Sequence, residues 1–214
     1  MELQGKKINF LGDSITEGVG TSDSSKTYHA LLKESVGLAA ARNYGKSGTK
    51  IARLPVITDD PFDKDFNLRA PDMDKDADVV VVFGGTNDYG HGTIPLGDFD
   101  NRDIHTFYGG MHNLCQYLIK EYTGKTIVFM TPIHRMEEKA FAGNDKSRDL
   151  VCFVRAIREV CEHYSIPVLD MYKESGMYGN MQIWCDKYMP DGLHPNNLGH
   201  EIMAHKLQKF LENL

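Results

Sequence analysis

The feature that most constrains the fold is a run of five consecutive apolar residues, Val79 to Phe83. A strand without polar alternation has to be covered on both faces, and such strands occur in parallel sheets flanked by helices. It belongs to a candidate strand from Ala77 to Phe83. Similar short apolar runs lie at Lys7 to Leu11, Thr126 to Met130 and Pro167 to Met171, with a weaker candidate at Ala40 to Tyr44. The sequence therefore predicts a parallel sheet of about five strands.

The segments between these runs carry apolar residues at helical spacing. They include 28–36, 107–122, 150–164 and 198–211. Strands that alternate with helices favour right-handed crossovers, and hence an α/β fold in which helices cover both faces of the sheet, a three-layer α/β/α sandwich. We find no internal repeat, low-complexity tract or break in composition, so we expect residues 1–214 to form a single domain.

The composition excludes several classes of partner. The chain has 214 residues, a formal charge of −6 and 41% hydrophobic residues, as expected of a globular protein with a substantial core. The acidic balance argues against a general nucleic-acid or anionic-membrane partner, and the sequence contains no basic cluster for phosphate groups. No apolar stretch approaches the length of about 20 residues that a membrane span needs. No leader-like segment opens the chain, so we expect a cytoplasmic protein with four free cysteines.

Residues just after each strand are the candidates for chemistry, because ligands of open α/β sheets bind beyond the carboxyl ends of the strands. Gly12-Asp13-Ser14 follows the first predicted strand. Ser14 and Glu17 have the spacing of a capping box, which would merely start a helix. The functional interpretation is that the glycine permits a tight turn that presents the Ser14 hydroxyl and its backbone N–H.

Other hydrogen-bond donors follow the neighbouring strands. Asn87 comes soon after the Val79 to Phe83 run, and Asn43 to Gly48 follows the weaker strand. Both segments could be simple turns. Alternatively, the Asn87 amide, a glycine N–H and the Ser14 N–H could form an oxyanion hole around one hydroxyl.

Near the other end of the chain stands Asp191-Gly192-Leu193-His194. Asp191 could be a simple helix cap. An Asp three residues before a His can also fix the imidazole tautomer. Ser14, Asp191 and His194 are the one set in the sequence that completes a nucleophilic mechanism.

These blocks, in this order, resemble the SGNH (GDSL) hydrolases. Gly12-Asp13-Ser14, a glycine near residue 48, Gly85-Thr86-Asn87-Asp88 and Asp191-x-x-His194 match the four blocks of that family. The resemblance implies a flavodoxin-like sandwich and ester hydrolysis, with Ser14 as nucleophile and Asp191 and His194 completing the triad. It also implies an oxyanion hole from Ser14, Asn87 and a second-block glycine. Gly45 and Gly48 can both be aligned there, and we favour Gly48.

Other site types have weaker support. His200 and His205 are spaced five apart, which places them about 140° apart around a helix, so they cannot share a metal from one face. The alternating aspartates from Asp72 to Asp78 lack the glycine and glutamate of a calcium loop. The Gly18-Val19-Gly20 segment lacks the third glycine of a dinucleotide site. We therefore expect neither metal nor cofactor, although a non-catalytic flavodoxin-like module that binds phosphate or flavin remains the alternative of another class.

The sequence-based expectation is thus a carboxylic ester hydrolase that acts through an acyl-enzyme. The expected substrates are short-chain esters, most plausibly an acetyl group on a carbohydrate or other small alcohol, and lysophospholipase or thioesterase activity is the alternative within the family. Candidate substrate contacts are Asp13 beside the nucleophile, Tyr89 and His91 after Asn87, and Trp184, the only tryptophan. An aromatic wall would suit a sugar because its face stacks on apolar C–H groups.

Overall fold

The computed structural model describes residues 1–91, 93–139 and 148–214. Its centre is a five-stranded sheet with the strand order β2-β1-β3-β4-β5, and every neighbouring pair is parallel. This arrangement confirms the predicted sheet. The strands are β1 (Lys7–Gly12), β2 (Ala40–Gly45), β3 (Val79–Phe83), β4 (Thr126–Met130) and β5 (Val168–Leu169).

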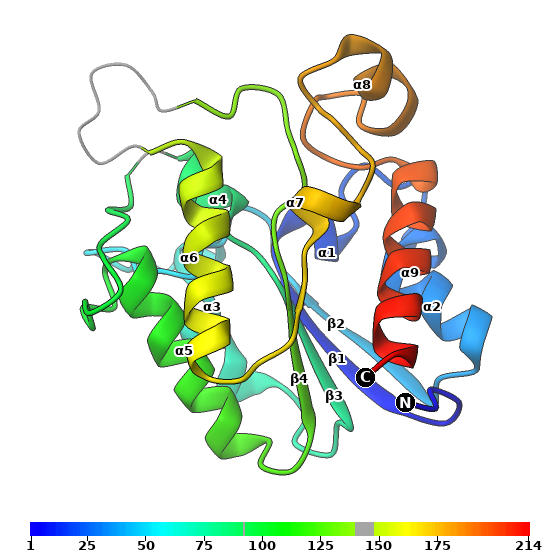
Figure 1. Cartoon of the computed structure of the whole chain (residues 1–214), viewed down its shortest axis with the longest axis horizontal. Coiled ribbons are helices and arrows are strands. Elements are labelled where there is room, and N and C mark those ends of the chain that lie inside the picture. Colours follow the sequence, from blue (N-terminus) through cyan, green and yellow to red (C-terminus); the bar gives the residue numbers. More distant parts are fainter. Residues whose placement is uncertain (92, 140–147) are drawn as a thin grey trace.

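Helices cover both faces of this sheet, which makes the fold an α/β/α sandwich (Figure 1). On one side lie α2 (Tyr28–Val36) and α9 (Asn197–Glu212), which pack against each other. On the other side lie α5 (Phe107–Glu121) and α6 (Leu150–His163), which also form a pair. The four helices agree with the helical spacing in the sequence.

The apolar run in β3 separates the two halves of the core. Val80 and Val82 belong to the cluster under α5 and α6, whereas Val79, Val81 and Phe83 belong to the cluster under α2 and α9. All five side chains are buried, because successive residues of a strand point to opposite faces and both faces are covered here. The absence of alternation in the sequence is therefore a direct consequence of the two helical layers.

The remaining helices are short, and several of them lie at the end of the sheet where the strands finish (Figure 1). With only four to seven residues each, they are too brief to show a helical period in the sequence. They are α1 (Ser14–Glu17), α3 (Phe66–Arg69), α4 (Thr86–Gly90), α7 (Met171–Glu174) and α8 (Gln182–Tyr188), with 3₁₀ turns at Ser24–Lys26, Pro61–Asp63 and Ala70–Asp72.

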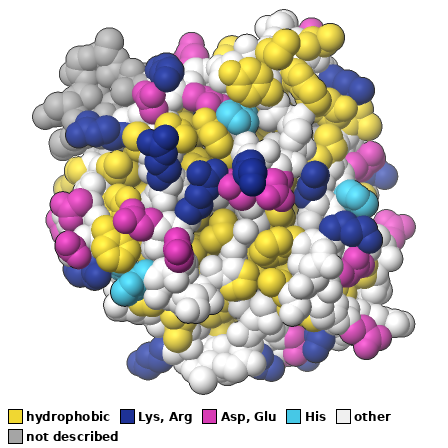
Figure 2. Space-filling view, in the orientation of Figure 1, with side chains coloured by type: hydrophobic (Ala, Val, Ile, Leu, Met, Phe, Trp, Pro, Cys, Tyr) yellow, Lys and Arg dark blue, Asp and Glu magenta, His cyan; other side chains and the backbone are white. Residues whose placement is uncertain are grey.

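The surface is mixed in character. Figure 2 shows basic side chains interleaved with acidic ones across one face, and apolar side chains gathered over α8. Two of the exposed apolar residues of this region are Ile183 and Met181, which are 70% and 49% exposed. Within the described ranges, none of the helices combines the length and the apolar character needed to cross a bilayer.

Candidate active site

The candidate catalytic residues meet at one edge of the sheet because they follow parallel strands. Ser14 begins α1 directly after β1, Gly48 lies in the loop after β2, and Asn87 lies on α4 after β3. Parallel strands end at the same edge, so their following residues converge there. The turn from Asp191 to His194, which precedes α9, completes the group.

The start of α1 differs from the expected capping box. Asp13, rather than Ser14, is the N-cap, and its Oδ1 accepts a hydrogen bond of 3.0 Å from the N–H of Ile15. The Glu17 side chain does not bond back to the start of α1, as in a capping box. Its carboxylate instead accepts hydrogen bonds from the N–H and the hydroxyl of Ser47. The Ser14 hydroxyl is therefore not used for capping, and Glu17 ties the loop after β2 to the helix that carries Ser14.

A continuous chain of hydrogen bonds links Ser14, His194 and Asp191. Ser14 Oγ lies 2.9 Å from His194 Nε2, and His194 Nδ1 lies 2.6 Å from Asp191 Oδ2. The second carboxylate oxygen, Oδ1, accepts the backbone N–H groups of Leu193 and His194 at 2.9 and 2.7 Å. With both oxygens engaged, the carboxylate holds the tautomer in which Nδ1 carries the proton and Nε2 can accept one from the serine.

The electrostatics of Asp191 suit this arrangement. Its partial burial acts to raise the pKa, but the hydrogen bonds from His194 and Leu193 outweigh that effect and hold the pKa below the ordinary value. Asp191 is therefore ionised at neutral pH, where a carboxylate can stabilise a positive charge that forms on the neighbouring imidazole.

Two of the expected oxyanion-hole residues, Asn87 and Gly48, each have an N–H group that makes no hydrogen bond within the described residues. The Asn87 side chain is 6% exposed, and its Nδ2 donates one bond of 3.1 Å to the carbonyl of Thr49, which leaves a second N–H. The N–H of Gly48 has no hydrogen-bond partner among the described residues, and its φ of +72° is one that glycine adopts without strain.

Gly45 serves a different purpose from Gly48. Its N–H already donates to Asn43 Oδ1 at 2.8 Å. A Cβ on Gly45 would lie 2.1 Å from the backbone nitrogen of Glu17, so this glycine permits β2 to pack closely against α1. The local geometry thus favours Gly48 over Gly45 as the free donor.

Buried polar residues hold α1, the helix that begins at Ser14, and the sequence analysis pointed to none of these contacts. Tyr28 packs its ring parallel to that of His200, at 5.9 Å between centroids, and its hydroxyl bonds to Thr16 at 3.0 Å. His200 Nδ1 accepts the N–H of Tyr28, so His200 is a packing residue of α9. A second histidine, His29, bonds to the carbonyl of Thr16 at 3.1 Å. These contacts hold α1 against α2 and α9.

The structure places the four expected substrate contacts in different surroundings. Asp13 is 1% exposed and serves as a cap, and Tyr89 is 1% exposed because its ring packs on Phe153 in the core. Trp184 stacks on Tyr188 in a hollow between α8 and α9, whose lining includes none of the triad residues. His91 is exposed at the end of α4, near Asn87.

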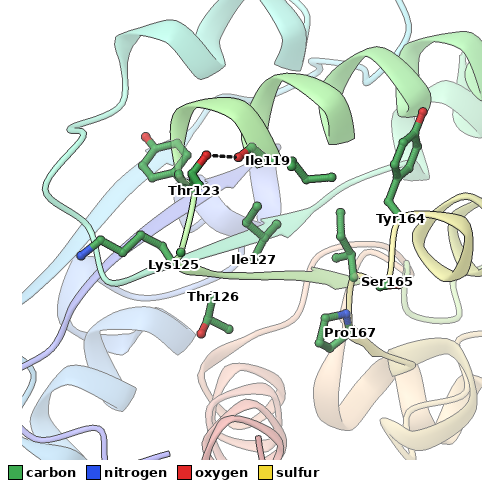
Figure 3. Close-up of a pocket in the computed structure, with 11 residues that line it drawn as sticks. Ile119, Thr123, Lys125, Thr126, Ile127, Tyr164, Ser165 and Pro167 are labelled. Atoms are coloured by element: carbon green, nitrogen blue, oxygen red, sulfur yellow. Dashed lines mark hydrogen bonds between the residues drawn. The ribbon is translucent and has the colours of Figure 1, made fainter.

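A further hollow lies at the opposite end of the sheet (Figure 3). It is formed by the end of α5, the start of β4 and residues 164–167, and its residues include Thr123, whose hydroxyl bonds to the carbonyl of Ile119. Because it lies where β4 begins, it is far from the edge at which Ser14, Asn87 and His194 meet. It is therefore separate from the candidate active site.

The burial of Asp13 predicts a pH-dependent stability. Desolvation raises its pKa to about 7, against opposing contributions from the Ile15 hydrogen bond and Arg69. A carboxyl group with a raised folded-state pKa destabilises the fold as it ionises, so stability is lost as the pH rises from about 4 to about 7. The rise in the pKa of Asp13 from 3.8 to about 7 corresponds to a loss of about 4 kcal/mol in the free energy of unfolding. We expect wild-type protein to lose stability relative to Asp13→Asn between pH 4 and 7, as measured by urea unfolding; parallel curves would contradict this.

The family model that describes the GDSL-like lipase/acylhydrolase family matches residues 10–202 of the chain. The matched segment contains Ser14, Gly48, Asn87, Asp191 and His194. It covers most of the chain, from β1 into α9. No curated protein matches the chain.

Solved structures share this fold over nearly the whole chain. A protein from Lactobacillus plantarum is 31% identical, with a TM-score of 0.85 over 99% of this chain and 98% of that one. An acetyl xylan esterase is 23% identical, with a TM-score of 0.65 over 95% and 98% of the two chains. A salicylyl-acyltransferase of a tetracycline biosynthetic pathway is 20% identical, with a TM-score of 0.68 over 98% of this chain and 55% of its own length.

Proposed function

The chain belongs to the GDSL-like lipase/acylhydrolase family, and we propose that it is a carboxylic ester hydrolase in which Ser14 is the nucleophile. The observation that carries the proposal is the chain of hydrogen bonds from Ser14 through His194 to Asp191. Each residue has a different role, and the three roles together form a complete acyl-transfer mechanism. A phosphate- or flavin-binding module would leave Asp191 and His194 without a purpose.

In the first half of the reaction, Ser14 Oγ attacks the ester carbonyl. His194 Nε2, at 2.9 Å, removes the serine proton as the new C–O bond forms. Asp191 stabilises the imidazolium, and the negative charge on the former carbonyl oxygen is met by the Gly48 N–H, the Ser14 N–H and the Asn87 amide. The tetrahedral intermediate then collapses, and His194 protonates the leaving alcohol.

In the second half, water replaces the alcohol. His194 takes a proton from the water as its oxygen attacks the acyl carbonyl, and the same three donors hold the second oxyanion. Collapse returns the proton to Ser14 Oγ and releases the carboxylic acid. The enzyme thus uses one imidazole as base and acid in turn, with no change in the position of Asp191.

Covalent labelling tests this proposal directly. An organophosphonate ester should form a stable adduct on Ser14, which mass spectrometry of the intact protein and of its peptides would locate. Prior incubation with an ester substrate should slow the labelling. The purified protein should be colourless; a bound flavin, together with an unmodified Ser14, would favour the binding-module alternative.

The proposed acyl group is short, most plausibly acetyl. The similarity in fold to an acetyl xylan esterase is compatible with this choice. The side chains of Ser14 and Asn87, which form part of the proposed site, are each only 6% exposed. We expect kcat/KM for 4-nitrophenyl esters of two to sixteen carbons to be highest at two to four carbons. A maximum at long chains would contradict the short-acyl proposal and favour a lysophospholipase.

A further inference from the structure

Two basic side chains lie beside the oxyanion residue Asn87, on two different loops. The first is Lys50, in the segment that runs along the first turn of α4. Next to it, the carbonyl of Thr49 accepts a bond from Asn87, and the N–H groups of Ile51 and Ala52 donate to the Asp88 carboxylate at 3.0 and 2.9 Å. Lys50 is therefore held between the two backbone contacts that fix Asn87 and its neighbour.

The second basic side chain is Arg135, in the loop after β4. Its Nη1 lies 3.1 Å from Thr86 Oγ1 and 3.3 Å from the Thr86 carbonyl, directly before Asn87. The next residue, Met136, donates its N–H to the carbonyl of Gly192 at 2.8 Å. Arg135 thus lies between the start of α4 and the turn that carries the proposed triad histidine.

Neither cation forms an ion pair with any residue of the described ranges, in contrast to nearby basic residues such as Lys46, which pairs with Glu17. Lys50 is only 6% exposed, and Arg135 Nε is buried without a hydrogen-bond partner in the structure described. Burying a cation is costly unless an anion or a set of acceptors compensates it. The charges of Asp88 and Asp63 favour the ammonium form of Lys50, and the Tyr89 ring lies 5.4 Å from the Arg135 guanidinium carbon, but neither contact is an ion pair.

Both Lys50 and Arg135 belong to segments that contact the start of α4, which His91 follows. Although His91 is exposed, its pKa is lowered first by partial desolvation of the imidazole and then by the charges of Lys50 and Arg135. His91 directly follows α4. The positive charge is therefore concentrated next to Asn87, in a chain whose net charge is −6.

We propose that the natural substrate carries an anionic group, a carboxylate or a phosphate, close to the scissile ester, and that Lys50 and Arg135 bind it. Hydrogen bonds from ammonium and guanidinium groups to such anions are among the strongest that side chains make. The inference rests on the proposed ester hydrolysis and specifies its substrate class. The sequence contains no local basic cluster because the two residues are far apart along the chain, and the fold brings both of their segments against α4.

The test compares esters that differ in charge but little in size. On the acyl side, mono-4-nitrophenyl glutarate is compared with 4-nitrophenyl valerate; on the alcohol side, 4-carboxyphenyl acetate is compared with 4-carbamoylphenyl acetate. Uncatalysed rates are subtracted from each. We expect kcat/KM for the anionic member of at least one pair to exceed that for its neutral partner by about 10-fold or more, since one charged hydrogen bond contributes roughly this much. The pair that responds shows which side of the ester carries the anion.

Variants then connect this preference to the two cations. Lys50→Met and Arg135→Gln should each reduce the anionic-to-neutral ratio of kcat/KM by about 10-fold, whatever the accompanying change in the rate for the neutral esters. Arg135→Lys should retain part of the ratio, and Lys46→Met, which removes a paired cation, should leave it unchanged. Added salt should weaken the preference. Circular dichroism establishes that each variant is folded.

The possible failures are distinguishable. Hydrolysis of the neutral esters with no anionic preference, or with a preference that survives in both Lys50→Met and Arg135→Gln, would overturn the substrate class and leave the ester-hydrolase proposal standing. Hydrolysis of none of the four esters would overturn both. Equal losses on both members of a pair would show that the cations serve the scaffold, and would also overturn the substrate class.

Discussion

The substitution Ser14→Ala is expected to lower kcat for 4-nitrophenyl acetate by a factor on the order of 10⁴ to 10⁶. The hydroxyl that lies 2.9 Å from His194 is the only atom of this residue that can form the acyl-enzyme. Removing it leaves the oxyanion donors in place, so a small residual rate above that of water should remain. The measurement is steady-state release of 4-nitrophenol by purified protein, with active-site titration to exclude contamination by wild-type enzyme.

His194→Ala should give a loss of similar size, and the double variant should be little worse than either single one, because the two residues act as a unit. His205→Ala is the matched control, since this histidine lies exposed on α9, away from the triad. Its activity should equal that of wild-type protein. Activity within a few-fold of wild type in Ser14→Ala or His194→Ala would refute the triad assignment.

The strands and long helices could be predicted in their order along the chain, because each produces a local pattern of apolar residues. An apolar run such as Val79 to Phe83 is recognisable wherever both faces of a strand are buried, and α5, α6 and α9 each repeat an apolar face over several turns. The short helices at the edge where the strands end could not be predicted in this way. A helix such as α4 is fixed by bonds from distant segments to Asn87 and Asp88 rather than by its own periodicity.

Residues of the site could be proposed from the sequence where their chemistry requires a particular type and order. Ser14, Asp191 and His194 meet this condition, and the structure brings them into hydrogen-bond contact. Orientation is a different matter. Tyr89 is next but one to Asn87 in the sequence, yet on a helix two residues apart face different directions, and the ring points into the core.

Residues that support the site through tertiary contacts left no signal in the sequence. The capping role of Asp13 and the reach of Glu17 to Ser47 depend on how α1 meets the loop after β2. Lys50 and Arg135 likewise both lie near α4 because their loops follow two strands, β2 and β4, that end at one edge. Such pairs become visible when the fold places them together, since neither residue belongs to a recognisable motif.

Replacing Asn87 with alanine should lower kcat for short esters by about 10²- to 10³-fold, with a much smaller effect on KM. The amide is expected to bind the oxygen only after it becomes an oxyanion, and an interaction confined to the transition state contributes to kcat rather than to substrate affinity. Asn87→Asp should be at least as damaging as Asn87→Ala, because a carboxylate would repel the negative charge that the amide stabilises.

Asn87 also donates to the Thr49 carbonyl, so the loss could reflect a displaced loop instead of a missing oxyanion donor. Asn67→Ala is the control for this. The Asn67 amide is similarly buried, and it donates a hydrogen bond of 2.8 Å to the carbonyl of Ile51, in the same loop as Thr49. If loop position alone mattered, both variants would lose activity and stability together. We expect only Asn87→Ala to lose kcat by two orders of magnitude or more at a similar melting temperature, whereas equal losses in the two variants would remove Asn87 from the oxyanion hole.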